Sequence, residues 1–364
     1  MADDGGARRD LVVIGASAGG VEALSGVVAG LPPDLQAAIC IVLHVAPGSP
    51  SALASILQRA GRLPCHAARD GDALQNGHIL VAPPDRHMVI ENGRVRLTVG
   101  PRENGHRPAV DALFRSAAAS AGRRVIGVVL SGTRDDGTAG LAMIKQNGGM
   151  AIVQDPADAA YRGMPASALE HVVVDEVVPL QRLATAIAEM VGRSPPPKPS
   201  GSREPLGVLS NPVDDPSHSG GAAHDRVQSA GASADPKQRG EPSMICPDCG
   251  GVLEERSDVG EMQWECRVGH RYSPQSLIDA HADGVEAALW AAVTALEDRI
   301  SLLNRMAQRA EGQGQSRSAR SFRRRAENAG SQAGLVRDAL TSAATAALQR
   351  LAPEDTPNDE ESVA

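Results

Sequence analysis

The feature of this sequence that most constrains its fold is a regular alternation of strand-like and helical runs between residues 10 and 190. Short apolar runs such as DLVVIG and AAICIVL are followed by helical ones, GGVEALSGVVAGL and PSALASILQRA, and the pattern returns in VIGVVLS, GTAGLAMIKQNG and AIVQ. Strands that alternate with helices of about ten residues pair in parallel through right-handed crossovers. The sequence therefore predicts an α/β fold with a doubly wound, mainly parallel sheet.

One stretch interrupts this alternation. HILVAPP and HMVIENGRVRLTV differ from the rest, and in the second of them two alternating runs flank the dipeptide Asn92-Gly93. An Asn-Gly pair between such runs is typical of a tight hairpin turn. We therefore expect a β-hairpin inserted in the α/β domain.

Changes in composition divide the chain into segments. Residues 194–243 are rich in Pro, Ser, Gly and Asp and nearly free of large apolar residues, which predicts a disordered linker after the α/β domain at 8–193. Next come a small module at 244–275, named here the cysteine module, a helical hairpin or coiled coil at 276–351, and an acidic disordered tail at 352–364. In the first predicted helix of the hairpin, apolar residues recur three or four positions apart: Val285, Leu289, Ala292, Leu296, Ile300 and Leu303.

The overall composition argues against several classes of protein. The formal net charge is -8, whereas a general nucleic-acid binder carries a basic face. The first residues, Met1-Ala2-Asp3-Asp4, are acidic where a secretory signal is basic, and no apolar run approaches the roughly 20 residues of a membrane-spanning helix. We expect a cytoplasmic protein that does not bind nucleic acid and does not insert into a membrane.

The loop after the first predicted strand carries a serine between small residues. Gly15-Ala16-Ser17-Ala18-Gly19 has the pattern G-x-S-x-G, in which a sharp strand-to-helix turn exposes the hydroxyl and leaves backbone N–H groups to hold an oxyanion. The glycine spacing does not fit a dinucleotide fingerprint, and no lysine is present for a phosphate-binding loop. Taken alone, the pattern also fits a serine that only caps the following helix.

In an open α/β sheet, ligands bind beyond the carboxyl ends of the strands. This rule brings together Ser17, His44 after AAICIVL, and Asp135 and Asp136 after VIGVVLS. A serine becomes a nucleophile when an imidazole takes its proton and a carboxylate orients the imidazole. All three residue types are predicted at one edge, although His44 alone fits a partly buried structural histidine and Asp136 alone fits a helix cap or turn.

These residues lie in motifs that resemble the catalytic domain of the CheB-type chemotaxis protein-glutamate methylesterases. The motifs are IGASAGG, LHVAPG, LVAPPDRHM, HRPAVDALF, GVVLSGTRDDGTAG and RGMPASAL, in this order between residues 10 and 190. The resemblance implies that Ser17 is the nucleophile, His44 the general base and acid, and Asp136 the orienting carboxylate. It implies hydrolysis of glutamyl methyl esters on a methylated chemoreceptor or a receptor-like signalling protein, and extends to deamidation of glutamine.

The resemblance also implies roles around the triad. Backbone N–H groups of the Ala18 turn or the Thr133 loop are expected to hold the oxyanion. His106 and Arg107, in the HRP stretch, are expected to contact the substrate or anchor their loop, and a structural salt bridge fits Arg107 equally well. The chain departs from well-known members at Ala18, where a hydroxyl is missing, and only about nine residues precede the first strand, so we expect no receiver domain. A signalling adaptor that uses this fold without turnover is the alternative.

Three of the five cysteines cluster in the cysteine module. Cys246-Pro-Asp-Cys249 and Cys266-Arg-Val-Gly-His270 form two close pairs of ligands, which predicts a tetrahedral structural Zn²⁺ site, with reduced thiols or a redox pair as alternatives. His281 is a less suitable fourth ligand, and no cofactor is expected for catalysis. The module is either a staple for a segment too short to build a core or a docking site for a partner protein. Because the linker separates it from the catalytic domain, we expect metal removal to unfold 244–275 alone.

Overall fold

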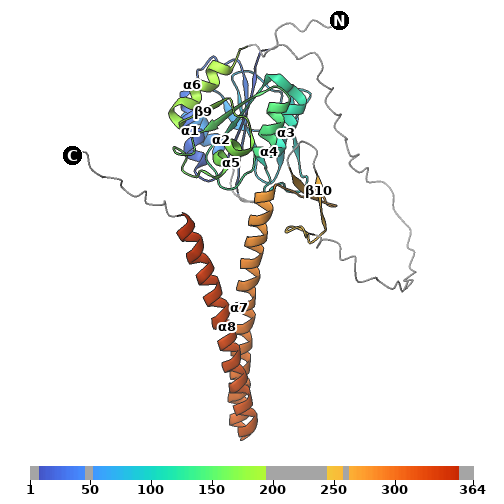
Figure 1. The fold of residues 1–364 in the computed structure, drawn as a ribbon, viewed down its shortest axis with the longest axis vertical. Helices are drawn as coiled ribbons and strands as arrows, with labels where there is room; N and C mark the ends of the chain where they lie inside the picture. The colour runs from blue at the N-terminus through green and yellow to red at the C-terminus, as the bar shows by residue number, and fades with distance from the viewer. Residues whose placement is uncertain (1–7, 46–51, 194–243, 257–261, 352–364) are drawn as a thin grey trace, which may run out of the picture. The chain divides into compact units, whose positions relative to one another are not determined.

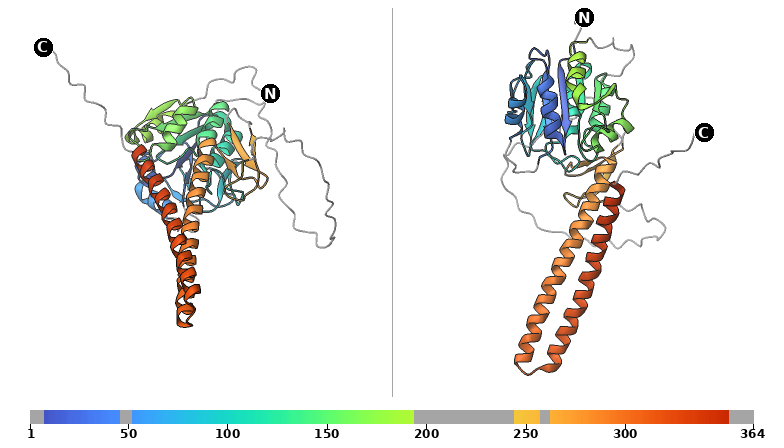
Figure 2. Two further views of the ribbon diagram at one scale, coloured as in Figure 1. Left: turned by 60° about the horizontal axis from the view of Figure 1, so that its bottom comes forward. Right: turned by 90° about the vertical axis from the view of Figure 1, so that its left-hand side faces the viewer.

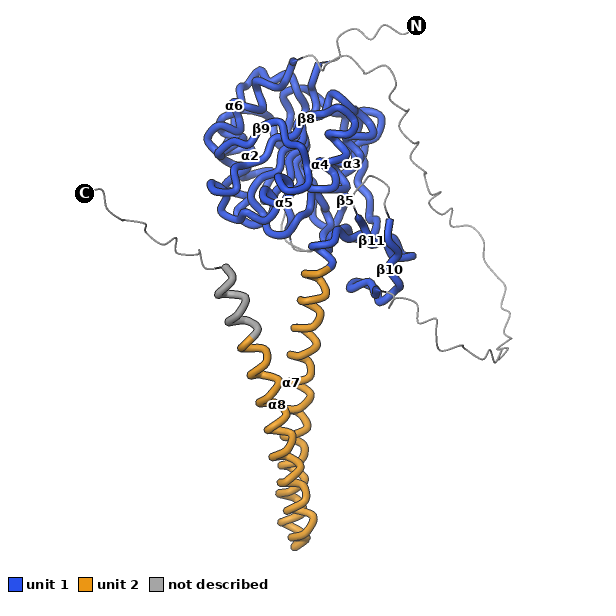
Figure 3. The backbone as a smooth tube through the Cα atoms, in the orientation of Figure 1, with its two compact units in different colours: residues 1–277 blue, residues 278–364 orange. Residues whose placement is uncertain are grey.

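The structure, a computed structural model, describes residues 8–45, 52–193, 244–256 and 262–351. The predicted linker at 194–243, the predicted tail at 352–364 and the end of the LHVAPG motif lie outside these ranges. The chain divides into two compact units, Met1–Leu277 and Ile278–Ala364, each coloured separately in Figure 3. No helix in the described ranges combines the length and the apolarity that crossing a bilayer requires.

The first unit is built on a seven-stranded sheet whose neighbouring strands are all parallel (Figure 1). The strand order is β3-β4-β2-β1-β7-β8-β9. The chain starts in the middle of the sheet and adds strands first on one side and then on the other, so the prediction of a doubly wound α/β fold is confirmed. The order changes direction beside β1, which is where such sheets bind ligands. The strands are β1 (Leu11–Ala16), β2 (Ala38–Leu43), β3 (Cys65–Ala67), β4 (Ile79–Val81), β7 (Val125–Val129), β8 (Met150–Gln154) and β9 (Glu176–Val178).

The predicted hairpin is present as a separate two-stranded antiparallel sheet. It consists of β5 (His87–Glu91) and β6 (Arg94–Thr98), joined by Asn92 and Gly93 with φ of 49° and 72°. Both values lie in the left-handed region that a tight hairpin turn requires. HILVAPP, which we set apart from the alternating pattern, instead contributes β4 to the parallel sheet.

Helices cover both faces of the parallel sheet (Figure 2). Val12 and Ile14 of β1 pack in one core with α1, α2 and α6, whereas Leu11 and Val13 pack in a second core with α3, α4, α5 and the hairpin. Alternate residues of a strand point to opposite faces, so β1 is buried on both sides. The helices are α1 (Gly20–Gly30), α2 (Leu53–Ala60), α3 (Val110–Ala121), α4 (Thr138–Gln146), α5 (Gly163–His171) and α6 (Leu180–Met190), with a 3₁₀ turn at Gly122–Arg124.

The cysteine module belongs to the same compact unit as the α/β domain, although 50 residues of sequence, 194–243, separate them. It contains a three-stranded antiparallel sheet of β10 (Leu253–Arg256), β11 (Gln263–Cys266) and β12 (Arg271–Tyr272). Its last residues lead directly into a long helix. The two parts are therefore distant in sequence but packed in space, and the separation that we expected from the linker is not observed.

The second unit is an antiparallel pair of long helices (Figure 3). They belong to α7 (Pro274–Gly312) and α8 (Ser316–Leu351), and ion pairs join Arg323 to Glu311 and Arg337 to Glu297. The buried face of α7 differs in part from the predicted apolar stripe. Val285 is 61% exposed, whereas Val293, which the stripe did not include, is 3% exposed.

Candidate active site

Ser17 directly follows β1, and its backbone is fixed by the neighbouring chain. Its N–H donates to the carbonyl oxygen of Ser131 at 3.0 Å, just after β7. The N-cap position of α1 is taken by Gly19, whose φ of 70° is left-handed, and no side chain caps this helix. Ser17 is therefore not the helix cap.

Gly132 passes very close to Ser17. A Cβ added at Gly132 would lie 2.1 Å from the Sδ atom of Met164 and 2.9 Å from the Cβ of Ser17. Real Cβ atoms do not approach other atoms so closely, because interiors are packed without spare volume. The glycine in SGTRDD thus allows the loop after β7 to close around the serine.

His44 bridges Ser17 and Asp136. Its Nδ1 lies 3.1 Å from the Ser17 Oγ, and its Nε2 lies 2.6 Å from the Asp136 Oδ2. An ionised carboxylate only accepts hydrogen bonds, so Nε2 carries the proton and the Nδ1 lone pair accepts from the serine hydroxyl. The side chains of His44 and Asp136 are 5% and 2% exposed, so water is largely excluded from their contact. The three residues form one hydrogen-bonded chain.

The carboxyl group of Asp136 is held by the start of α3. Its Oδ2 accepts from the Val110 N–H at 2.7 Å, and its Oδ1 accepts from the Asp111 N–H at 3.2 Å. A helix N-terminus favours a negative charge. Burial opposes ionisation, but the hydrogen bond from His44 and the Val110 N–H outweigh it and hold the pKa of Asp136 below its usual range. Asp136 is therefore ionised and able to stabilise a charged imidazole.

A second buried carboxyl group, that of Asp111, lies beside Asp136. Burial and the nearby charge of Asp136 raise the pKa of Asp111. The Nδ2 amide of Asn104 donates to both acids, at 2.8 Å to the Asp111 Oδ2 and at 2.9 Å to the Asp136 Oδ1. One amide group thus holds the two acidic side chains side by side.

His106 contacts the triad through its ring. Its centroid lies 3.7 Å from that of His44, with 11° between the two ring planes. Burial, together with the proximity of His44, lowers the pKa of His106 to about 4, so the ring is neutral at neutral pH. The neutral His106 ring therefore lies stacked on the His44 ring.

Arg107 joins its own loop, between β6 and α3, to the turn between β4 and β5. Its Nε and Nη2 donate to the Asp85 Oδ1 at 3.0 and 2.7 Å, and its Nη1 donates to the carbonyl oxygen of Gly100 at 2.8 Å. The hydrogen bond from Arg107 lowers the pKa of Asp85. The ion pair with Asp85 is the structural salt bridge that was the alternative for Arg107, and the contact with Gly100 fits an anchor of its loop.

Two further predicted residues, Ala18 and Thr133, directly follow Ser17 and Gly132 in the chain. Within the described part of the chain, the backbone N–H groups of Ala18 and Thr133 donate no hydrogen bond to another residue, and Ser17 lies next to Ala18. Asp135 is not part of the triad, because its Oδ1 accepts from the Ser276 Oγ at 2.5 Å.

Sequence reasoning missed Asn104. Asn104 and Gly105 have φ of 52° and 77°, and the N–H of His106 donates to the carbonyl oxygen of Glu103 at 2.8 Å. This is a tight turn of the kind that an Asn-Gly pair favours. The signal was present in PRENGHRP, and it is the same signal that predicted the hairpin at Asn92.

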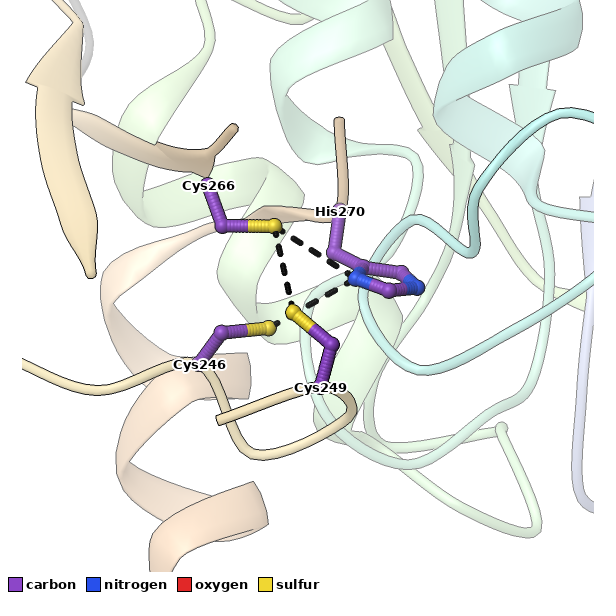
Figure 4. A group of neighbouring side chains, drawn as sticks. All are labelled: Cys246, Cys249, Cys266 and His270. Atoms are coloured by element: carbon purple, nitrogen blue, oxygen red, sulfur yellow. Dashed lines mark hydrogen bonds between the residues drawn. The ribbon is translucent and has the colours of Figure 1, made fainter. Parts of the chain in front are cut away.

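The four predicted metal ligands converge in the cysteine module (Figure 4). We call Cys246, Cys249, Cys266 and His270 the cysteine cluster. Their ligand atoms all lie within 4.8 Å of one another, and the group does not include His281. The His270 Nδ1 lies 3.6 Å from the Cys246 Sγ and 3.4 Å from the Cys266 Sγ, and the Cys249 and Cys266 sulfurs are 3.6 Å apart. Tetrahedral Zn–S and Zn–N bonds place ligand atoms about 3.5 to 3.8 Å apart, so the cluster fits such an ion.

The fold and the geometry together define the class of site. A buried chain of serine, histidine and aspartate at the carboxyl edge of a parallel sheet has the chemistry of a serine-type hydrolase. In chain order the histidine precedes the aspartate, unlike the order of the α/β-hydrolases.

Comparison with known proteins identifies the family. The CheB methylesterase family matches residues 12–187. A relative from Leptospira interrogans is 37% identical over 176 residues, which make up 48% of this chain and 91% of that relative. The solved CheB methylesterase catalytic domain of Thermotoga maritima is 34% identical, covers 50% of this chain and 98% of its own, and has a TM-score of 0.48. The chain belongs to the CheB methylesterase family.

A further relative shows how much of a longer protein is matched. The protein-glutamate methylesterase/protein-glutamine glutaminase 2 of Anaeromyxobacter dehalogenans is 45% identical over 184 residues, which cover 50% of this chain and 54% of the relative. The chain thus spans about half the length of this curated relative. The match to the family, residues 12–187, contains Ser17, His44 and Asp136 and ends before the cysteine module.

Proposed function

We propose that residues 8–193 hydrolyse glutamyl methyl esters on chemoreceptor-like signalling proteins. The observation that carries the proposal is the hydrogen-bonded chain from Ser17 through His44 to Asp136. Membership of the CheB methylesterase family and the names of its curated relatives, protein-glutamate methylesterase/protein-glutamine glutaminase, support the substrate class. The same names support deamidation of glutamine as a second reaction.

Acylation follows from the position of each group. The Ser17 Oγ attacks the ester carbonyl carbon while the Nδ1 of His44 takes the hydroxyl proton, and the Asp136 carboxylate stabilises the resulting imidazolium. Backbone N–H groups of Ala18 or Thr133 hold the oxyanion of the tetrahedral intermediate. His44 then gives its proton to the departing oxygen, methanol leaves, and the glutamyl group remains as an ester on Ser17.

Deacylation repeats these steps with water as the nucleophile. His44 takes a proton from the water, the hydroxide attacks the acyl carbon, and the proton returns to the Ser17 Oγ as the carboxylic acid is released. With a glutamine side chain as substrate, ammonia leaves in place of methanol. One set of groups therefore serves both reactions.

The test is methanol release from a methylated chemoreceptor by the full-length chain. Ser17→Ala should reduce the rate by at least about 10⁴-fold, since the nucleophile is lost. Ser25→Ala is the matched control, because the Ser25 hydroxyl only donates to the Val21 carbonyl oxygen within α1. If Ser17→Ala releases methanol as fast as the unmodified chain, or if no methanol is released and a fluorophosphonate does not label Ser17, the proposed catalysis is contradicted and the signalling adaptor is favoured.

We also propose that the cysteine cluster holds a structural Zn²⁺ ion. Four protein ligands fill a tetrahedral ion and leave no position for a water, which is typical of structural sites. When bound, the ion would fix the two ligand pairs and thereby the fold of the cysteine module.

Metal analysis tests the zinc site. The full-length chain should hold one zinc ion after dialysis, and Cys249→Ser should lose it, whereas His281→Asn should retain it. A full zinc content in Cys249→Ser would contradict the assignment.

We propose finally that the cysteine module docks on the signalling protein that carries the substrate. Its apolar side chains at Ile245, Val252 and Val268 are 50 to 60% exposed, which is typical of a contact surface. Val252→Asp in the full-length chain should weaken capture of the methylated receptor, with the rate of Ser17 labelling by a fluorophosphonate as a control for folding.

A further inference from the structure

The residues that follow the last metal ligand contact the loop of the active site. After His270, the carbonyl oxygen of Arg271 accepts from the Asn104 N–H at 2.8 Å, and the Arg271 N–H donates to the Arg102 carbonyl oxygen at 3.3 Å. Two residues further on, the Ser273 N–H donates to the Asn104 Oδ1 at 2.9 Å. The end of the cysteine module is thus hydrogen-bonded to the turn that carries Asn104 and His106.

Asn104 uses both ends of its side-chain amide. The Oδ1 accepts from Ser273, while the Nδ2 donates to Asp136 and Asp111. Its side chain is buried, with only 3% of the residue exposed. If the amide turned over, its oxygen would face two carboxyl groups and its NH₂ group would face another N–H donor. The N–H of Ser273 therefore sets which end of Asn104 faces the triad.

A second contact ties the same segment to the loop after β7. The Ser276 Oγ donates to the Asp135 Oδ1 at 2.5 Å, and both residues are buried. The Ser276 N–H in turn donates to the Ser273 Oγ at 3.2 Å, so Ser273 caps the start of α7. Asp135 is the direct neighbour of the triad carboxylate. Residues 271–276 thus contact both segments that surround Asp136.

The packing beside the cluster is close. A Cβ added at Gly269, between Cys266 and His270, would lie 3.1 Å from the Cγ of Pro101. Gly269 has a φ of 98°, so only glycine adopts this backbone without strain. A rearrangement of the cluster would therefore move the segment that holds Asn104.

We propose that the cysteine module is a positioning element of the active site, so that metal bound at the cysteine cluster holds Asn104 against Asp136 and metal loss slows catalysis. The inference rests on the proposed function of the triad and deepens it with a mode of control. Asn104 is a positioning residue, because it contacts Asp136 and not the reacting atoms. Loss of its contact would remove a donor from the carboxylate and release the turn that stacks His106 on His44.

The test measures labelling of Ser17 by a fluorophosphonate in the full-length chain, which needs no receptor. The Ser17 Oγ–P bond forms, fluoride leaves, and the proton passes to His44. Chelation that removes the metal should slow labelling by about 10- to 100-fold, the effect of losing one hydrogen bond to a charged group. Addition of Zn²⁺ should restore the rate.

Two substitutions at similar turns separate the inference from a general effect on folding. Asn104→Gly removes the amide without strain, because the φ of residue 104 is 52°. It should slow labelling as much as chelation does, and chelation should then have no further effect. Asn92→Gly, at a turn residue with φ of 49°, should keep both the rate and its sensitivity to chelation.

A second readout is the proton resonance of the hydrogen bond between the His44 Nε2 and the Asp136 Oδ2. It should be sharp and far downfield in the zinc-loaded chain, and broadened or shifted after chelation and in Asn104→Gly. The inference is overturned if chelation leaves both labelling and this resonance unchanged, or if it still slows Asn104→Gly by the same factor. If metal-dependent labelling is observed but no methylated receptor is hydrolysed, the proposed substrate is wrong and the inference stands.

Discussion

The two sides of the triad are held in different ways. Ser17 and His44 follow adjacent strands, and short backbone hydrogen bonds of the sheet fix both: Ser17 N–H to Ser131 and His44 N–H to Ala16. Asp136 is held by the first amides of α3 and by Asn104, whose partner Ser273 is 169 residues away in sequence. The nucleophile side depends on backbone hydrogen bonds at the ends of parallel strands, whereas the carboxylate side depends on a helix N-terminus and on a side chain that the cysteine module holds.

The largest loss of Ser17 labelling is expected when the carboxylate of Asp136 is replaced. Asp136→Asn should reduce Ser17 labelling by about 10⁴-fold, because an amide that donates to His44 favours the wrong tautomer. Asp34→Asn, at an exposed position, is the control. A loss smaller than about tenfold would mean that the Ser17–His44 pair works without its carboxylate.

On the nucleophile side, Gly132→Ala should displace Ser17. The new Cβ would lie 2.9 Å from the Cβ of Ser17 and 2.1 Å from the Sδ of Met164, so the serine must shift. We expect about a 100-fold loss of labelling and a decrease in the free energy of unfolding of about 1–3 kcal/mol in urea titrations. Gly26→Ala is the matched control, since its Cβ would meet Leu180 at an ordinary 3.5 Å. Equal rates for the two variants would contradict the close approach at Gly132.

The stacking of His106 on His44 can be tested by the pH dependence of the free energy of unfolding. Its pKa falls from 6.5 to about 4 on folding, so the unfolded chain binds more protons between these values. Stability should therefore be greatest above pH 6.5 and fall by roughly 3 kcal/mol as the pH decreases to 4. Denaturant unfolding at pH 7 and pH 4.5 measures this loss.

His106→Gln should lose less stability on acidification than the unmodified chain. His171→Gln, at an exposed position, should behave like the unmodified chain. An unchanged pH dependence in His106→Gln would show that the ring stacked on His44 is not the group that resists protonation.

The smallest effect is expected at the ion pair of Arg107 and Asp85. The Asp85 side chain is 49% exposed, and solvent weakens such pairs. Asp85→Asn should leave the rate of Ser17 labelling unchanged and shift the urea midpoint less than any variant above. A tenfold slower reaction would mean that the anchor of Arg107 also positions the turn of Asn104.

The hydrogen-bonded chain of serine, histidine and aspartate could be predicted from the sequence because each of its residues follows a long, strongly apolar strand. Ser17, His44 and Asp136 come after β1, β2 and β7, and the rule that strand ends meet at one edge brought them together. The strands β3 and β9, with three residues each, were not predicted, since so short a run carries no periodic signal.

The supports of the carboxylate could not be predicted in the same way. The Asn104-Gly105 pair indicates a turn, but nothing local indicates that its amide faces Asp136 or that Ser273 holds it. The apolar periodicity of α7 predicts a stripe through Ala292, whereas the neighbouring Val293 is the buried residue, because side chains three and four apart fit two neighbouring faces of a helix. Long-range packing decides both where the Asn104 amide points and which face of α7 is buried.

The donor that orients Asn104 is a peptide N–H and not a side chain. Every amino acid except proline supplies such a group at position 273. The contact between the cysteine module and the α/β domain therefore does not depend on which side chain occupies position 273. The contact depends instead on the spacing between His270 and residue 273 and on Asn104, which accepts the hydrogen bond. An insertion or deletion just after His270 would therefore separate the cysteine module from Asn104.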